Sequence, residues 1–218
     1  MSAAAIEIPL FPLNVVLFPG MVLPLHIFEP RYRQMITECS QTDKPFGIVL
    51  AQPGSVPMLE VPYTIGTMAE IRDLDRLEDG RFTLIALGTQ RFRILSQHRE
   101  KPYLSGFVEV YKDIEEPTEE VARYAKQAYA LFSNYLELLL EAIDQHELQT
   151  ALPEVPEDLS YFIAYFLDIV DEQKQQFLEM TSTLLRLQEE ITILRREVPF
   201  VRQMLLNKAA EDDHSMLN

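Results

Sequence analysis

The sequence predicts an α+β fold in which a small barrel of short β-strands is followed by a helical bundle. Three observations predict it. Up to about residue 114 the apolar runs are short and bounded by proline, glycine or charge, which is typical of closely connected strands. From Pro117 apolar residues recur every three or four positions, which is the period of a helix. The formal charge changes at the same point, from −2 over residues 1–113 to −13 over residues 114–218.

We therefore expect three parts: a β-rich subdomain over residues 1–114, a helical bundle over residues 115–208 and a disordered acidic tail over residues 209–218. With 218 residues, of which 47% are apolar, the chain can fill one large core or two small ones. The acidic second half should repel nucleic acids and anionic membrane surfaces.

Ile8–Met35 is the most proline-rich part of the chain and reads IPLFPLNVVLFPGMVLPLHIFEPRYRQM. Because proline fixes φ and lacks a backbone donor, no helix can run through its first part. We expect strands at Val15–Phe18 and Met21–Leu25, joined by the Pro-Gly turn between them. A helix should follow over Arg31–Glu38, with Pro30 setting the φ of its first residue.

Further short strands are expected at 46–50, 64–71, 81–87, 90–95 and 103–111. The charged segment Asp73–Asp79 should form a turn, and the two prolines within Val56–Thr64 predict a loop or an edge strand. Gly88-Thr89 is expected to be the turn that joins two of the strands as an antiparallel pair.

Helices are expected at 118–144, 159–170, 173–180 and 184–205. The last one carries leucine, isoleucine and valine at alternating spacings of three and four, which is the pattern of helix-on-helix packing. Pro199 should kink or break it near residues 195–199. This helix can pack inside its own bundle or pair with a second copy, and we favour the internal packing because the other helices also need partners.

The proline-rich opening resembles the start of the N-terminal, substrate-binding domain of ATP-dependent Lon proteases. The segments PLFPL, FPG and PLHIFEPRY follow one another in that family's order. The resemblance continues through GTMAEI at 66–71, DGRFTLIALGTQRFRIL at 79–95 and much of 152–180. It implies a PUA-like pseudo-barrel that binds unfolded or extended polypeptide segments, in protein quality control or as an adaptor.

The resemblance does not extend to catalysis. The phosphate-binding pattern GxxxxGK[ST] has no match among the seven glycines, and the Ser-Lys peptidase dyad of the family lies in a region that this chain does not contain. We therefore expect a stand-alone, non-catalytic module with no cofactor and no metal site, for which a separate ATPase or protease is a candidate partner. A single cysteine and the lack of an export signal predict a cytoplasmic location, and no apolar run is long enough to span a membrane.

Cys39 with His26 or His98 would be the one imaginable nucleophile and base. A free cysteine near the end of a helix is more often a small buried residue, and we expect that here. We likewise expect His26 to be a hydrogen-bonded core residue. The four histidines are far apart in sequence and lack metal-ligand spacing.

Arginines gather between residues 72 and 99, and PUA-like folds include RNA binders, so a basic stripe is an alternative worth testing. Acidic residues at 73, 75, 78 and 79 interleave with the arginines at 72, 76, 81, 91, 93 and 99. Cross-strand ion pairs are the simpler interpretation, and we do not expect nucleic-acid binding.

The opening stretch holds more large apolar side chains than a small barrel readily buries. We expect some of them to line an exposed groove for an extended peptide. The alternative for each is an ordinary place in the core. The candidates are Leu17, Phe18, Pro19, Met21, Phe28 and Tyr32.

Overall fold

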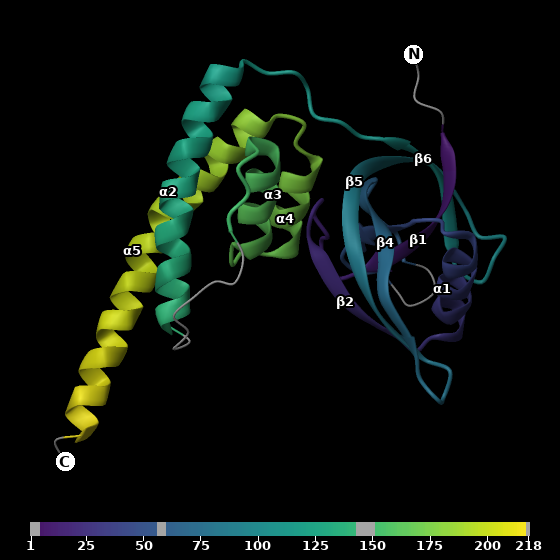
Figure 1. Cartoon of the computed structure of the whole chain (residues 1–218), viewed down its shortest axis with the longest axis horizontal. Helices are drawn as coiled ribbons and strands as arrows, with labels where there is room; N and C mark the ends of the chain where they lie inside the picture. The colour runs from purple at the N-terminus through teal and green to yellow at the C-terminus, as the bar shows by residue number, and fades with distance from the viewer. Residues whose placement is uncertain (1–4, 56–59, 143–150, 217–218) are drawn as a thin grey trace. The chain divides into compact units, whose positions relative to one another are not determined.

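The computed structural model describes residues 5–55, 60–142 and 151–216, with side chains up to residue 207 (Figure 1). The chain divides into two compact units. The first contains Met1–Asp113 and Ala164–Thr181, and the second contains Ile114–Ile163 and Ser182–Asn218. The chain therefore leaves the first unit near residue 113, returns near residue 164 and leaves again near residue 182.

The first unit is built on one mixed sheet in the order β2-β5-β4-β3-β1-β6, in which β6 also pairs with β5. This second pairing closes the other strands into a small barrel, while β2 adds to the edge of β5. Among the described strands, β1 and β3 form the one parallel pair. The α+β fold and the small barrel predicted from the sequence are thus confirmed. The strands are Ile6–Leu13 (β1), Val22–Ile27 (β2), Phe46–Leu50 (β3), Ile65–Arg76 (β4), Phe82–His98 (β5) and Leu104–Val110 (β6).

The opening stretch departs from its prediction at one strand. Val15–Phe18 is irregular, and the first strand is formed earlier, by Ile6–Leu13. Leu17 is nevertheless buried, and its carbonyl accepts a hydrogen bond of 2.5 Å from the Thr67 hydroxyl, which satisfies it without a strand ladder. The helix after Pro30 is confirmed: α1 spans Pro30–Thr42, with the proline in its first turn.

β5 is one continuous strand, so the predicted turn at Gly88-Thr89 is wrong. Gly88 lies in the middle of β5, where its N–H donates to the Met21 carbonyl and its own carbonyl accepts from Gly20, both at 2.9 Å. A Cβ on Gly88 would collide with the Phe18 carbonyl oxygen. The glycine therefore permits a close backbone approach and does not mark a turn. The charged turn also starts later than expected, because β4 continues to Arg76.

Helix α4 (Asp171–Glu179) belongs to the first unit and is fastened to the barrel by polar side chains. The buried Arg91 guanidinium donates to the carbonyls of Leu178 at 2.7 Å and Met180 at 2.6 Å. Gln175 donates to the Ile65 carbonyl at 3.0 Å, which ties the helix to the start of β4. Main-chain carbonyls at the end of α4 are thus satisfied by the barrel, as helix ends require.

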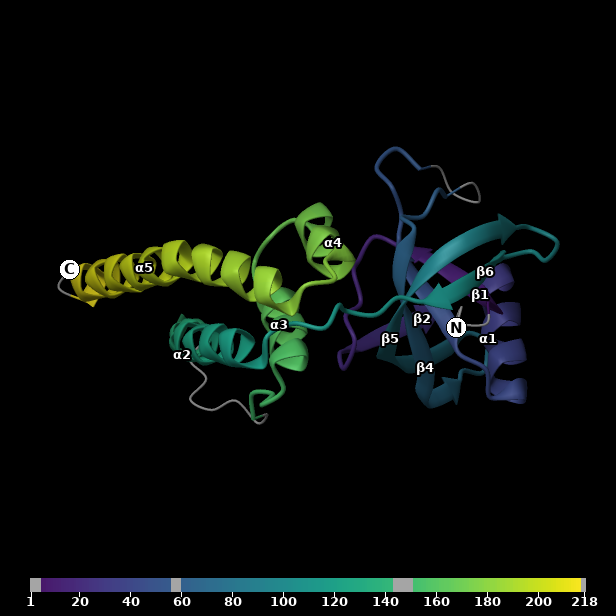
Figure 2. The same cartoon turned by 90° about the horizontal axis from the view of Figure 1, so that it is seen from above.

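The second unit is helical. It contains α2 (Thr118–Ala142), most of α3 (Pro156–Phe166) and α5 (Thr183–Met216). Figures 1 and 2 show α2 lying alongside α5. The predicted heptad positions of α5 face this packing, since Leu187, Ile191 and Leu194 are buried. The Ser182 hydroxyl accepts from the Leu185 N–H at 3.0 Å, so a serine caps α5.

The expectation at residues 195–199 is a kink or a break. α5 continues across Pro199, so the helix does not break there, and the kink stays a prediction. Because the helix extends to Met216, it also enters the segment where composition predicts disorder. Side chains from residue 208 onward lie outside the described part, and the disorder of residues 209–218 stays a prediction.

Candidate functional site

The six candidate residues of the opening stretch fall into two groups. Leu17, Phe18 and Tyr32 are buried, as the core alternative expects. Pro19 and Met21 are half-buried, and Phe28 is 61% exposed. Only the second group can be reached by another molecule without unfolding the barrel.

Phe28 is held at a well-fixed corner between β2 and α1. Its ring lies 6.1 Å from that of His26, edge to face. Just beyond it, the Arg31 guanidinium bonds to the carboxylates of Glu29 and Glu60, both at 2.9 Å. These two ion pairs hold the segment that follows Phe28. The exposed ring therefore belongs to a surface fixed by side-chain contacts.

β2 forms an edge of the sheet, because among the described residues it pairs with β5 alone (Figure 1). Its side chains alternate: Leu23, Leu25 and Ile27 pack toward the core. Those of Val22, Pro24 and His26 are exposed. The exposed position of His26 corrects the expectation that it lies in the core. This alternation, with a proline at an outer position, is a signal of an edge strand that can be read from the sequence.

The hydrogen-bond register of β2 decides which backbone groups are open. Residues in an antiparallel pair alternate between hydrogen-bonded and non-hydrogen-bonded positions. Gly88 donates to Met21, which makes positions 23, 25 and 27 the bonded ones. Val22, Pro24 and His26 therefore turn their backbone groups away from β5. Pro24, which has no N–H, stands where no donor to β5 is needed.

A shallow hollow of about 430 Å³ lies on the outer face of the same strands. Pro24 and His26 form one side, Thr83 and Ile85 line its middle, and carboxylates from β4 form the other side. The carboxylates are those of Asp73 and Asp75, both exposed. Asp73 has φ of 48°, and the β4–β5 register shifts at this point, so a β-bulge presents the two acids.

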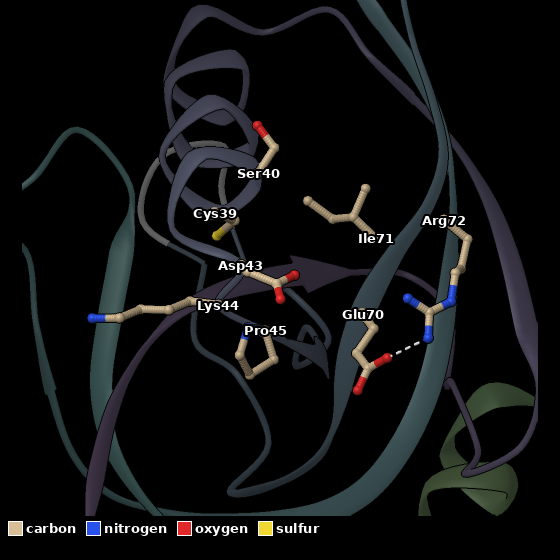
Figure 3. A pocket seen from close by; sticks show the side chains of 8 residues that line it. All are labelled: Cys39, Ser40, Asp43, Lys44, Pro45, Glu70, Ile71 and Arg72. Atoms are coloured by element: carbon tan, nitrogen blue, oxygen red, sulfur yellow. Dashed lines mark hydrogen bonds and ion pairs between the residues drawn. The ribbon is translucent and has the colours of Figure 1, made fainter.

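A second hollow, of about 290 Å³, lies where α1 ends beside β4 (Figure 3). Asp43, directly after α1, points toward Glu70 and Arg72 of β4, which pair with each other at 2.6 Å, whereas the Lys44 side chain points away from them (Figure 3). Burial raises the pKa of the Cys39 thiol to about 11, so the thiol stays protonated at neutral pH. The expectation of a buried, structural Cys39 is confirmed, and this hollow contains no activated nucleophile among its described side chains.

The arginines do not form a continuous basic surface on the described residues. Arg91 is buried and pairs with Asp113. Arg93 pairs with Glu109 across β5 and β6 at 3.5 Å, as the cross-strand interpretation predicts. Arg81 pairs instead with its near neighbour Asp79 at 2.6 Å. Acidic partners thus accompany these arginines, which argues against a nucleic-acid surface.

Two further features are absent from the described part of the chain. No three histidine, cysteine, aspartate or glutamate side chains in it come together as metal ligands would. None of its helices combines the length and the apolar character needed to cross a membrane.

The model of one protein family, the ATP-dependent protease La (LON) substrate-binding domain, matches residues 7–196. A Lon protease of Anaeromyxobacter dehalogenans is 28% identical over 204 residues, which are 87% of this chain and 23% of that protein. One of Parabacteroides distasonis is 31% identical over 72% of this chain and 18% of its own length. The chain thus spans about a quarter or less of these curated relatives.

Two solved structures have the same fold. A Lon N-terminal domain protein from Xanthomonas campestris is 27% identical, with a TM-score of 0.64 over 86% of this chain and 98% of its own. The N-terminal domain of a Mycobacterium avium complex Lon protease superposes with a TM-score of 0.63 over 87% of this chain and 98% of its own. At 18% identity, this second likeness concerns the fold alone.

Proposed function

Because the chain belongs to the family of Lon substrate-binding domains, we propose that it binds unfolded or extended polypeptide segments and does not cleave them. The observation that carries the proposal is the exposure of Phe28 at an ordered corner of the stretch that defines the family resemblance. An exposed aromatic side chain can serve as an anchor for a partner, since aromatic residues are enriched among the residues that dominate binding energy.

The wider role we propose is in protein quality control or as an adaptor. A separate ATPase or protease that receives the bound polypeptide fits this role, because the part of the family that this chain matches is the substrate-binding domain. An adaptor needs only to hold its cargo reversibly. The acidic composition, with a formal charge of −15, favours protein cargo over nucleic acid.

The test is binding of fluorescein-labelled, unfolded casein, followed by fluorescence anisotropy. Phe28→Ser should weaken binding about five- to thirtyfold, the range of a buried aromatic anchor in an interface. Phe107→Ser is the matched control, since Phe107 is 44% exposed on β6, away from β2. Equal affinities for the two variants would remove Phe28 from the site, and absence of casein binding by the wild-type chain would refute the proposal.

A second experiment addresses catalysis. Casein incubated with the chain should stay intact on a gel, both with and without ATP and magnesium. A casein-cleaving activity that stays with the chain through further chromatography would contradict the non-catalytic role.

A second candidate function, pairing with another copy, is favoured by one observation on α5. Phe200 and Met204 lie four residues apart on this helix and are 60% and 56% exposed. Phe200→Ser should then shift a concentration-dependent dimer toward monomer in light scattering. A wild-type chain that remains monomeric at high concentration would exclude this candidate.

A further inference from the structure

We propose that the bound polypeptide segment adds to the open edge of β2 as an extra strand, and that the site prefers apolar segments carrying lysine or arginine. This inference rests on the proposed polypeptide binding and specifies how the same site would work. It combines the open backbone groups of β2, the exposed side chains around them and the carboxylates on the adjoining face.

The backbone of β2 provides the hydrogen-bonding groups of the proposed site. Val22 and His26 turn both the N–H and the carbonyl away from β5, and Pro24 turns its carbonyl the same way. An extended segment can form hydrogen bonds with these groups whatever its sequence, which suits the recognition of unfolded proteins. β5 and the barrel behind it hold the template rigid.

The side chains next to this edge provide the apolar contacts of the proposed site. A strand added to β2 would place every second side chain on the outer face, beside Val22, Pro24 and His26. Val22 is 48% exposed, and Phe28 follows directly after the strand. Apolar residues in the segment would therefore cover apolar surface that is now in contact with water.

Charge supplies the preference. Asp73 and Asp75 lie on the outer face of β4, which is separated from a strand added to β2 by three strand spacings, or roughly 14 Å. That distance exceeds the Debye length of about 10 Å at 0.1 M salt but lies well within that of about 30 Å at 0.01 M, so the preference is expected at low salt. β2 itself contains no lysine or arginine. A basic side chain on this face is attracted and an acidic one is repelled, and salt should weaken both effects.

Pro24 favours a foreign segment over a second copy of this chain. If two copies of β2 paired antiparallel about Pro24, two prolines would face each other and neither could donate a hydrogen bond. A foreign segment loses only the one bond that Pro24 cannot make. The missing donor also keeps the edge weak enough for reversible binding.

The experiment compares His26→Pro with His26→Ala. Both lose the imidazole, but only the proline removes the outward N–H, and it leaves the bonds to β5 in place. The probe is a short, labelled synthetic peptide that alternates valine with lysine. His26→Pro should bind it about five- to tenfold more weakly than His26→Ala, the loss expected for one hydrogen bond. Equal affinities of the two folded variants would overturn strand addition.

Further measurements use the wild-type chain and do not depend on whether a variant folds. In NMR hydrogen exchange, the peptide should slow exchange of the Val22 and His26 amides, and unchanged rates would overturn the proposal. The same peptide methylated on alternate backbone nitrogens should lose affinity. A glutamate-for-lysine peptide should bind more weakly, with a difference that shrinks as salt increases, and equal binding at low salt would overturn the charge preference.

Casein separates this inference from the function on which it rests. If casein binding is weakened by Phe28→Ser while the peptide gives no amide protection on β2, the site binds polypeptides by another mode and the strand addition is wrong. If neither casein nor the peptide binds, the proposed function itself fails.

Discussion

The attachment of α4 to the barrel should depend on one buried guanidinium, and Arg91→Met tests this. Arg91 is 3% exposed and donates to two carbonyls at the end of α4 while it pairs with Asp113. Its guanidinium also lies 5.0 Å from the centre of the Tyr111 ring. Methionine retains much of the apolar stem but removes every donor and the charge.

The expected loss of stability follows from these partners. Removing one member of a buried ion pair costs about 3–5 kcal/mol, because the remaining charge is left in a poorly solvated place. The Asp113 side chain is only 10% exposed, so water compensates little. With a urea dependence of about 2–3 kcal/mol per molar, the unfolding midpoint should fall by roughly 1–2 M.

The assay is urea unfolding followed by circular dichroism, with hydrogen exchange of the amides in residues 164–181. Arg93→Met is the matched control, because Arg93 lies two residues along the same strand with its side chain 47% exposed. Its ion pair should contribute less than about 1 kcal/mol. If Arg91→Met unfolds at the same urea concentration as this control and leaves α4 protected, the reasoning about the buried guanidinium is wrong.

Three other predictions concern single buried positions. The Cys39 thiol, whose pKa burial raises to about 11, should react with Ellman's reagent at pH 8 only as fast as the chain unfolds, and immediate labelling would contradict its burial. Both carboxylate oxygens of Glu190 are buried without a hydrogen-bond partner in the described chain, and burial raises its pKa well above the usual value. The unfolding free energy should therefore fall as pH rises from the unfolded-state pKa of about 4.3 toward the raised folded-state value, and Glu190→Gln should flatten this slope in urea titrations across that range. Gly88→Ala should lower the unfolding free energy by about 1–3 kcal/mol in urea, since its methyl group would overlap the Phe18 carbonyl oxygen, and an unchanged midpoint would show that the backbone there can move.

The sequence alone determined the main features of this fold, because each has a local cause. Prolines exclude a helix from the opening stretch, and Pro30 marks the start of α1. The apolar run Phe46–Leu50 is a fully buried strand, as its composition predicts. The heptad spacing of α5 predicts which of its residues are buried, as Leu187 and Leu194 illustrate. Period, proline and motif order act over a few residues, so they can be read without knowing the fold.

Only the tertiary structure decided which distant segments pair and which side chains they bury. A glycine such as Gly88 is typical of a turn in the sequence. In the structure it lies in the middle of β5, where the close approach of the Phe18 carbonyl requires a residue without a side chain. Phe18 and Phe28 have the same side chain in one apolar stretch, yet the first is fully buried and the second is exposed. Their difference arises because neighbours far apart in sequence cover one ring and not the other. The candidate binding edge of β2 was likewise decided by which strand it pairs with, and strand pairing is a long-range contact that local pattern does not specify.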